Sequence, residues 1–287
     1  MEYSWAWDPL CISVTSVDPV HSVIFTTGFQ PSTLAKSHQI TKPQVEGMYA
    51  VDGMWWKPER AVAGFVALSN TTSSAVNARV QASDSQGNVV GDYAIRVSAH
   101  GTKIVTLRAL ETLAEGNVGG LRVLHSGTVE GVLINGWLED QSSGYSANLA
   151  FHYSFTGASQ QNGPEIYAEL GLMTGAADPM MQFPAGTTFM PFSVARNVSS
   201  QPVSVTPTFY WMQEGSAHSV KLQSFTLLPA EARDLNVPNL LVGAGLKDFN
   251  GSVNLILEST GSPRALLLAS GVSIRGRLTC SKCCPEA

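Results

Sequence analysis

The stretch GFVALSNTTSSAV (Gly64–Val76) recurs later in the chain as PFSVARNVSSQPV (Pro191–Val203). In each copy a run of alternating apolar and polar residues leads into a turn rich in Asn and Ser, and a Val then opens the next run. Alternation with a period of two is typical of a half-buried β-strand, and Asn and Ser favour turns. Each copy therefore predicts two consecutive strands joined by a short turn.

The similarity extends beyond these two stretches. Asn70 and Asn197 are 127 residues apart, and matches with small gaps continue upstream to Asp52 and Asp178 and downstream to Gly261. Self-similarity at a fixed period indicates a repeated structural unit. We therefore divide the chain into an N-terminal segment (1–22), a first unit (23–148), a second unit (149–274) and a Cys-containing tail (275–287).

Both units are predicted to be all-β sandwiches. Runs of strand-like sequence are separated by turns rich in Gly, Pro and Asn, and the helix-like piece Arg108–Glu115 is at most two turns long. Short strands at a spacing of about 8–12 residues favour a β-sandwich over a sheet with crossover helices.

The turns between the paired strands (Asn-Thr-Thr-Ser-Ser and Asn-Val-Ser-Ser) and the Leu-Pro-Ala-Glu turn before Asp234 carry a family resemblance. They resemble the tandem immunoglobulin-like sandwich domains of secreted bacterial surface proteins. The resemblance covers most of residues 60–275 but lacks the Cys…Trp…Cys core of antibody domains. It implies two tandem immunoglobulin-like sandwiches, an extracellular or cell-surface location, and a role in adhesion, spacing or assembly.

Composition narrows the range of partners. Of the 287 residues 44% are hydrophobic and 14% are charged, which predicts packed cores rather than disorder. The net charge is −5 and the Lys and Arg residues are scattered, so nucleic acid and anionic membrane surfaces are not expected partners. No apolar run reaches the roughly 18 residues that a membrane span requires.

The four cysteines lie near the two ends of the chain, at Cys11, Cys280, Cys283 and Cys284. The last three include a C-x-x-C spacing, but a structural zinc site needs a second pair of ligands and only Cys11 is left. We expect no metal site. A disulfide within the tail, a bridge from Cys11 to the tail, and free thiols all remain open.

The sequence carries no recognisable catalytic motif, and we expect neither an enzyme nor a cofactor. The six His are widely separated, and there is no nucleophile elbow and no phosphate-binding loop. Glu139 and Asp140 form the only adjacent acidic pair. A distributed site built from distant carboxylates, such as Glu139 and Asp178, stays an alternative.

Aromatic pairs supply the best binding candidates. Neighbouring residues of a strand point to opposite faces, so we expect one of Trp55 and Trp56 to be exposed. We select Trp55, Tyr210 and Trp211, because exposed aromatic side chains stack on sugar rings or fill a partner's pockets. Packing between the two units is the alternative, and it is favoured for Trp56.

Three Asn-x-Ser/Thr sequons occur, at Asn70, Asn197 and Asn250. In a secretory pathway all three could accept a glycan. Since Asn is also a common turn residue, turn formation explains these positions equally well.

The N-terminal segment bears on assembly. Cys11–Phe25 aligns with Trp137–Phe151, which reads as a strand that turns back into another, and the second unit has no such piece after Ile274. An unpaired sheet edge is a template for strand addition. The segment is then either a leader strand on the first unit or a cover for the second unit, in the same chain or in a neighbour. The arrangement with a neighbour would build a filament.

We predict a non-enzymatic structural protein that binds itself, another surface protein or a glycan, with carbohydrate binding or adhesion as the alternative function.

Overall fold

The computed structural model describes residues 12–18, 23–29, 45–56, 63–108, 118–140, 145–149, 151–153, 164–176, 186–261 and 265–275. All the strand pairings in these ranges are antiparallel, and α2 (Val237–Gly243) is a short helix of seven residues. The all-β prediction is therefore confirmed. Within these ranges no helix is long and apolar enough to cross a membrane.

The chain divides into two compact units. The first contains residues 1–159 together with 230–232, and the second contains residues 160–229 and 233–287. The sequence alone placed the start of the second unit at residue 149. The strand β11 (Phe151–Tyr153) lies beyond that point, but it pairs with β3 (Tyr49–Trp56) of the first unit.

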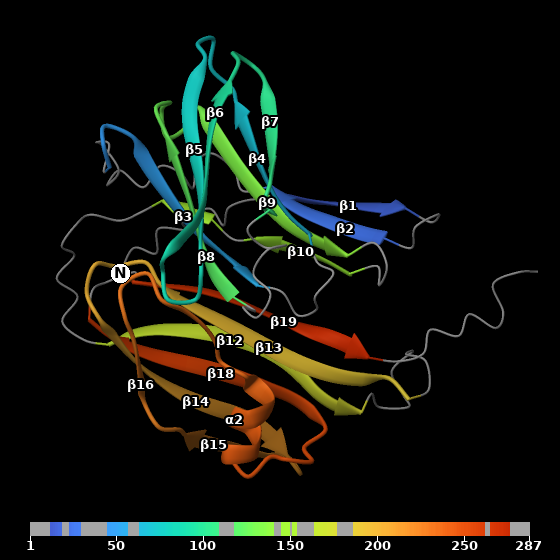
Figure 1. Ribbon diagram of the computed structural model, residues 1–287. Helices are drawn as coiled ribbons and strands as arrows, with labels where there is room; N and C mark the ends of the chain where they lie inside the picture. The colour runs from blue at the N-terminus through green and yellow to red at the C-terminus, as the bar shows by residue number, and fades with distance from the viewer. Residues whose placement is uncertain are drawn as a thin grey trace, which may run out of the picture. The chain divides into compact units, whose positions relative to one another are not determined.

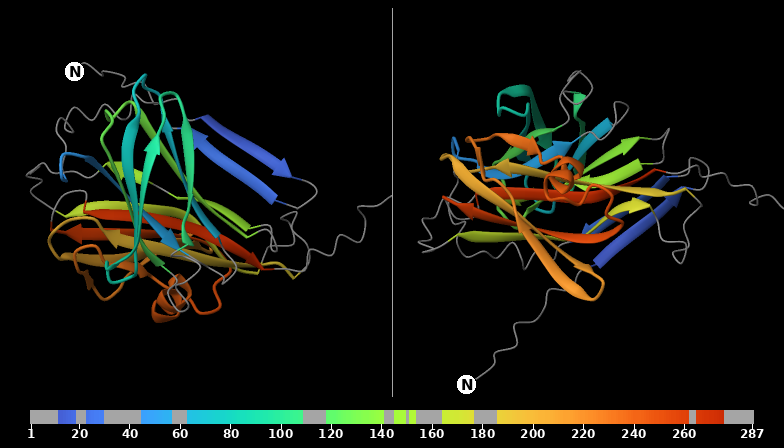
Figure 2. Two further views of the ribbon diagram at one scale, coloured as in Figure 1. Left: turned by 45° about the horizontal axis from the view of Figure 1, so that its top comes forward. Right: turned by 90° about the horizontal axis from the view of Figure 1, so that it is seen from below.

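The first unit has two larger sheets and a hairpin (Figures 1 and 2). The five-stranded sheet runs in the order β11, β3, β8 (Val118–His125), β5 (Val76–Ser83), β6 (Val89–Val97). The four-stranded sheet runs in the order β10 (Tyr145–Leu149), β9 (Val132–Asp140), β4 (Ala63–Asn70), β7 (Thr102–Thr106). The hairpin consists of β1 (Ile12–Asp18) and β2 (Val23–Phe29), and β2 lies beside β10.

The second unit has one connected set of eight strands (Figure 1). The order is β15 (Ser216–Lys221), β14 (Val203–Gln213), β18 (Gly251–Thr260), β12 (Glu165–Ala176), β13 (Thr188–Asn197), β17 (Ala232–Asp234). In addition, β16 (Phe225–Leu227) pairs with β14 and β19 (Leu266–Arg275) pairs with β13. A bulge after Glu169, where Gly171 has a φ of 71°, shifts the pairing of β12 with β18.

Alternation along the strands builds the cores. β4 alternates strictly between half-buried and buried residues, and Val66 and Leu68 are fully buried. In the second unit Phe209, Leu255 and Leu257 belong to one apolar cluster, and α2 adds Val237 and Leu241 to it. The helix begins after Asn236, whose side chain accepts from the backbone N–H of Asn239 over 3.3 Å.

Candidate functional site

Trp55 is a core residue, which corrects its selection as an exposed binding aromatic. Its side chain is 0% exposed, and its indole Nε1 donates to the backbone oxygen of Ser83 over 2.9 Å. A Cβ on Gly119, which lies opposite, would come within 2.4 Å of the indole. Trp56 is also buried, at 5% exposed, so β3 is covered on both faces and alternation leaves neither ring in solvent.

Tyr210 and Trp211 lie next to each other on β14 but do not form one surface. Tyr210 is exposed, whereas Trp211 is half-buried at the edge of the apolar core. The Trp211 ring stacks on His218 of the paired strand, with centroids 5.4 Å apart, and meets the Phe249 ring edge-on at 6.5 Å. The structure therefore separates the two aromatics to opposite faces of the sheet and gives Trp211 two ring partners.

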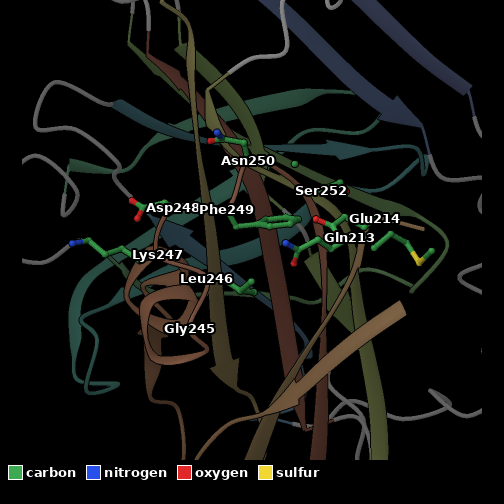
Figure 3. A pocket seen from close by; sticks show the side chains of 11 residues that line it. Gln213, Glu214, Gly245, Leu246, Lys247, Asp248, Phe249, Asn250 and Ser252 are labelled. Atoms are coloured by element: carbon green, nitrogen blue, oxygen red, sulfur yellow. The ribbon is translucent and has the colours of Figure 1, made fainter. Parts of the chain in front are cut away.

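Next to this aromatic cluster lies an open groove with a cavity volume of about 610 Å³. The lining residues come from the β14–β15 turn and from the loop between α2 and β18, namely Met212–Glu214 and Gly245–Ser252. Figure 3 shows the Phe249 ring between Asp248 on one side and Gln213 and Glu214 on the other.

Backbone geometry fixes both walls of the groove. Glu214 and Gly215 both have positive φ, 50° and 76°, as the tightest two-residue hairpin turns require. Gly245 (φ 79°) ends α2, and the Leu246 N–H donates back to the Leu241 carbonyl over 2.8 Å. The result is an open groove that is lined by the Phe249 ring and has a rim of mixed charge.

Asn70 ends β4 and organises the turn that follows. Its Nδ2 donates to the backbone oxygens of Ser74 (2.7 Å) and Ser98 (3.0 Å). Its Oδ1 accepts from both the backbone N–H (3.0 Å) and the hydroxyl (2.7 Å) of Thr72. The residue is only 2% exposed, so these bonds hold a buried amide.

Asn197 does the same at the end of β13. Its Nδ2 donates to the backbone oxygens of Gln201 (2.8 Å) and Leu227 (3.1 Å), and its Oδ1 accepts from the N–H (2.9 Å) and hydroxyl (2.8 Å) of Ser199. It is 0% exposed. A glycan on Nδ2 of Asn70 or Asn197 would require the amide to leave these bonds, so their observed role is to form turns.

Asn250, the third sequon, is different. It is exposed on the groove, and its Oδ1 accepts from the backbone N–H of Ala176 over 2.9 Å. Glycosylation at this position stays a prediction.

Two buried ionisable residues were not singled out by the sequence. His125 is fully buried, and its Nε2 lies 3.1 Å from the Tyr153 hydroxyl, which donates to the Val129 carbonyl over 2.9 Å. Its ring also stacks on Tyr49 at 5.6 Å. Burial lowers the pKa of His125 to about 4, and the backbone of Gly127 acts in the opposite direction.

Glu169 lies in the core of the second unit at 5% exposed. Neither carboxylate oxygen has a hydrogen-bond partner within the part of the chain that the structure describes. Burial raises the pKa of Glu169 to about 7, and the Ser193 hydroxyl acts in the opposite direction. One feature of the sequence could have pointed to Glu169. Alternation places Glu165, Tyr167 and Glu169 on one face of β12, and the apolar residues Ile166, Ala168 and Leu170 on the other.

The structure does not describe the cysteines or Asp178, which the sequence suggested as disulfide and distributed-site candidates. Cys11, Cys280, Cys283, Cys284 and Asp178 all lie outside the described residues, and so does any pair of Glu139 with Asp178. In the residues that are described, no three His, Cys, Asp or Glu side chains lie together as metal ligands would.

The chain matches no protein-family model and no curated protein.

Proposed function

We propose that this chain is a non-enzymatic extracellular structural protein, made of two copies of an immunoglobulin-like sandwich, that assembles head-to-tail through its terminal strands. The extracellular location and the immunoglobulin-like class rest on the turn motifs of the sequence. The duplication and the assembly rest on the strand pairings and hydrogen bonds of the two units.

The pairings of the two units support the duplication. β3, β8 and β5 are neighbours in that order in the first unit, as β12, β18 and β14 are in the second. Likewise β4 lies between β9 and β7, and β13 pairs with β19 and stands next to β17. The matching bonds of Asn70 and Asn197 occur at the same place in this order, where the strand ends.

One difference between the units carries the assembly proposal. In the first unit β9 pairs with β4 on one side and with β10 on the other. In the second unit β19 pairs with β13, and no described strand lies on its other side. β19 is ten residues long and has no proline and no charged residue before Arg275, so it lacks the usual protection of an edge strand.

The direction of the free backbone groups follows from two hydrogen bonds. The Val198 N–H donates to the Ala265 carbonyl (2.7 Å), and the Ser193 carbonyl accepts from Leu235 (2.8 Å), on the side away from β19. Because bonded and non-bonded pairs alternate in an antiparallel ladder, Ser270, which stands opposite Ser193, points its N–H and C=O away from β13. The same holds at Leu268, whereas the Leu266 N–H donates to the Tyr167 hydroxyl over 3.4 Å.

The occupant that we propose is the β1–β2 hairpin of a neighbouring chain. At the repeat offset of 126 this hairpin aligns with residues 138–155, a stretch that includes the end of β9 and the whole of β10. β10 pairs with β9 on the side that has no described counterpart beside β19. A contact between the start of one chain and the end of the next does not close on itself, so it generates a filament.

Ser270→Pro tests the edge. Proline removes an N–H that β13 does not use, so the unit should fold while strand addition is blocked. We expect filaments of the wild type and of Ser270→Ala in electron micrographs at high concentration, and none of Ser270→Pro or of a chain without residues 1–22. A wild type that stays monomeric, or a Ser270→Pro variant that still elongates, contradicts the proposal.

A second candidate function is glycan binding at the groove beside Trp211 and Phe249, with Tyr210 exposed on the other face of the strand. The observation that favours it is the Phe249 ring, which lines the groove beside polar rim groups and contacts Trp211. Titration with a glycan panel should quench tryptophan fluorescence of the wild type but not of Trp211→Leu. Absence of quenching across the panel removes this candidate.

A further inference from the structure

The outer face of β15, β14, β18 and β12 is unusually apolar for a surface. Ile166 (65%), Leu170 (72%), Tyr210 (45%) and Met212 (61%) are all exposed there. They account for four of the ten large apolar side chains exposed in the described residues. Apolar side chains that gather on one face mark an interaction surface, whereas the same side chains scattered singly do not.

Strand pairing makes this face continuous. Ile256 of β18 stands opposite Ala168 on one side and Thr208 on the other. Tyr210 stands opposite Asn254, and Met212 opposite Ala217. Since paired residues point to the same side of a sheet, the apolar side chains form one band across four strands.

β12 gives further support for an interaction surface, because its apolar residues point outward and a carboxylate points inward. Its outward residues Ile166, Ala168 and Leu170 are apolar, whereas its inward residues include the buried and unpartnered Glu169. A strand that had only to pack its own unit would place the apolar set inward. The outward apolar set is therefore explained by a partner that covers it.

The charge on this face indicates what the partner is. Lys221 and Glu258 are paired to each other over 2.8 Å, on adjoining rows of the same face. The face thus carries no net charge of its own, and burying it against an equally neutral apolar face would leave no charged group without a partner. A second copy of this sheet has that chemistry and meets the same conditions.

We propose that this face binds the same face of a second chain, sheet against sheet, about a two-fold axis. This contact goes beyond the edge contact proposed above. It closes at a dimer, whereas the edge contact runs on. Where both operate, the face contact joins two filaments side by side.

The area of this face determines how strongly two chains can bind through it. The seven residues of β14 from Thr206 to Met212 span roughly 20 Å, and three strand spacings with their side chains span about as much. The face therefore covers roughly 400 Å² on each chain, at or below the lower limit for a specific interface. We expect a weak, reversible dimer.

The test uses Ser270→Pro as the background, so that edge assembly does not contribute. Sedimentation equilibrium over a wide concentration range should give a mass that rises from one chain to two and stops there. Adding Ile166→Lys and Met212→Lys should raise the dissociation constant at least tenfold. Ile104→Lys, at a residue that is 60% exposed in the first unit, is the matched control and should leave it unchanged.

A mass of one chain throughout, or a dimer that the double substitution does not weaken, overturns this proposal and leaves the edge proposal standing. A mass that keeps rising overturns both proposals, because Ser270→Pro should not elongate. Binding to phosphatidylcholine vesicles that the double substitution abolishes, without any dimer, would assign the face to a membrane. If Ile166→Lys unfolds the second unit while Ile104→Lys leaves the chain folded, Ile166 faces inward and no such face exists.

Discussion

The side-chain amide of Asn197 donates to the backbone carbonyl of Leu227 over 3.1 Å, which ties the end of β13 to β16. Its second bond, to the carbonyl of Gln201, closes the turn that leads into β14. Asn70 has the equivalent pair of bonds in the first unit. One buried amide in each unit thus holds three strand ends together.

Asn197→Ala should lower the free energy of unfolding by about 2–4 kcal/mol, because two carbonyls lose a donor that water cannot easily replace. Ser200→Ala, at an exposed position of the same turn, should change it by less than about 0.5 kcal/mol. Urea unfolding followed by tryptophan fluorescence measures both. Equal effects of the two substitutions would show that the Asn197 bonds do not stabilise the unit.

His125 should make the first unit sensitive to acid. Its pKa is lowered to about 4 in the folded chain and is near 6.5 when unfolded, so unfolding takes up a proton between these values. Stability is therefore full above about pH 6.5 and falls as the pH drops toward 4, by at most about 3 kcal/mol.

The measurement is the free energy of unfolding at several pH values for the wild type and for His125→Gln, which is polar but does not titrate. We expect the difference between the two proteins to shift in favour of the variant from pH 7 to pH 4. A difference that is constant over this range would mean that His125 does not titrate between pH 4 and 6.5 on unfolding.

The pattern of alternation was enough to predict β4, β5, β13 and β14, since each has one face on a core and short turns at its ends. It was wrong for Trp55, because burial on both faces of β3 depends on what packs there, and neighbouring positions in the sequence do not carry that information.

β12 illustrates a second limit of predicting the fold from alternation in the sequence. Alternation alone would turn Ile166 and Leu170 inward, whereas the structure turns Glu169 inward and accommodates the change at a bulge before Leu172. A bulge inserts one residue, so it shifts the period within a strand.

The groove could not be predicted either, because its walls come from two turns that are far apart in the sequence and adjacent only in the folded unit.

Glu169 should give the second unit the opposite pH dependence. Its pKa is raised to about 7 in the folded chain, against about 4.5 when unfolded, so unfolding releases a proton between these values. Stability is full below about pH 4.5 and is lost as the pH rises through 7, by at most about 3 kcal/mol. Glu169→Gln removes this dependence because the amide stays neutral.

Hydrogen exchange measures the stability of each unit by itself, because backbone amides of β18 report on the second unit and those of β8 on the first. From pH 4.5 to pH 8, after correction for intrinsic exchange rates, protection of β18 should fall in the wild type and stay level in Glu169→Gln. Protection of β8 should rise in both proteins, because His125 becomes neutral in the unfolded state as well. If β18 protection rises with pH in the wild type, the Glu169 carboxylate is ionised in the folded chain and has a partner that stabilises its charge.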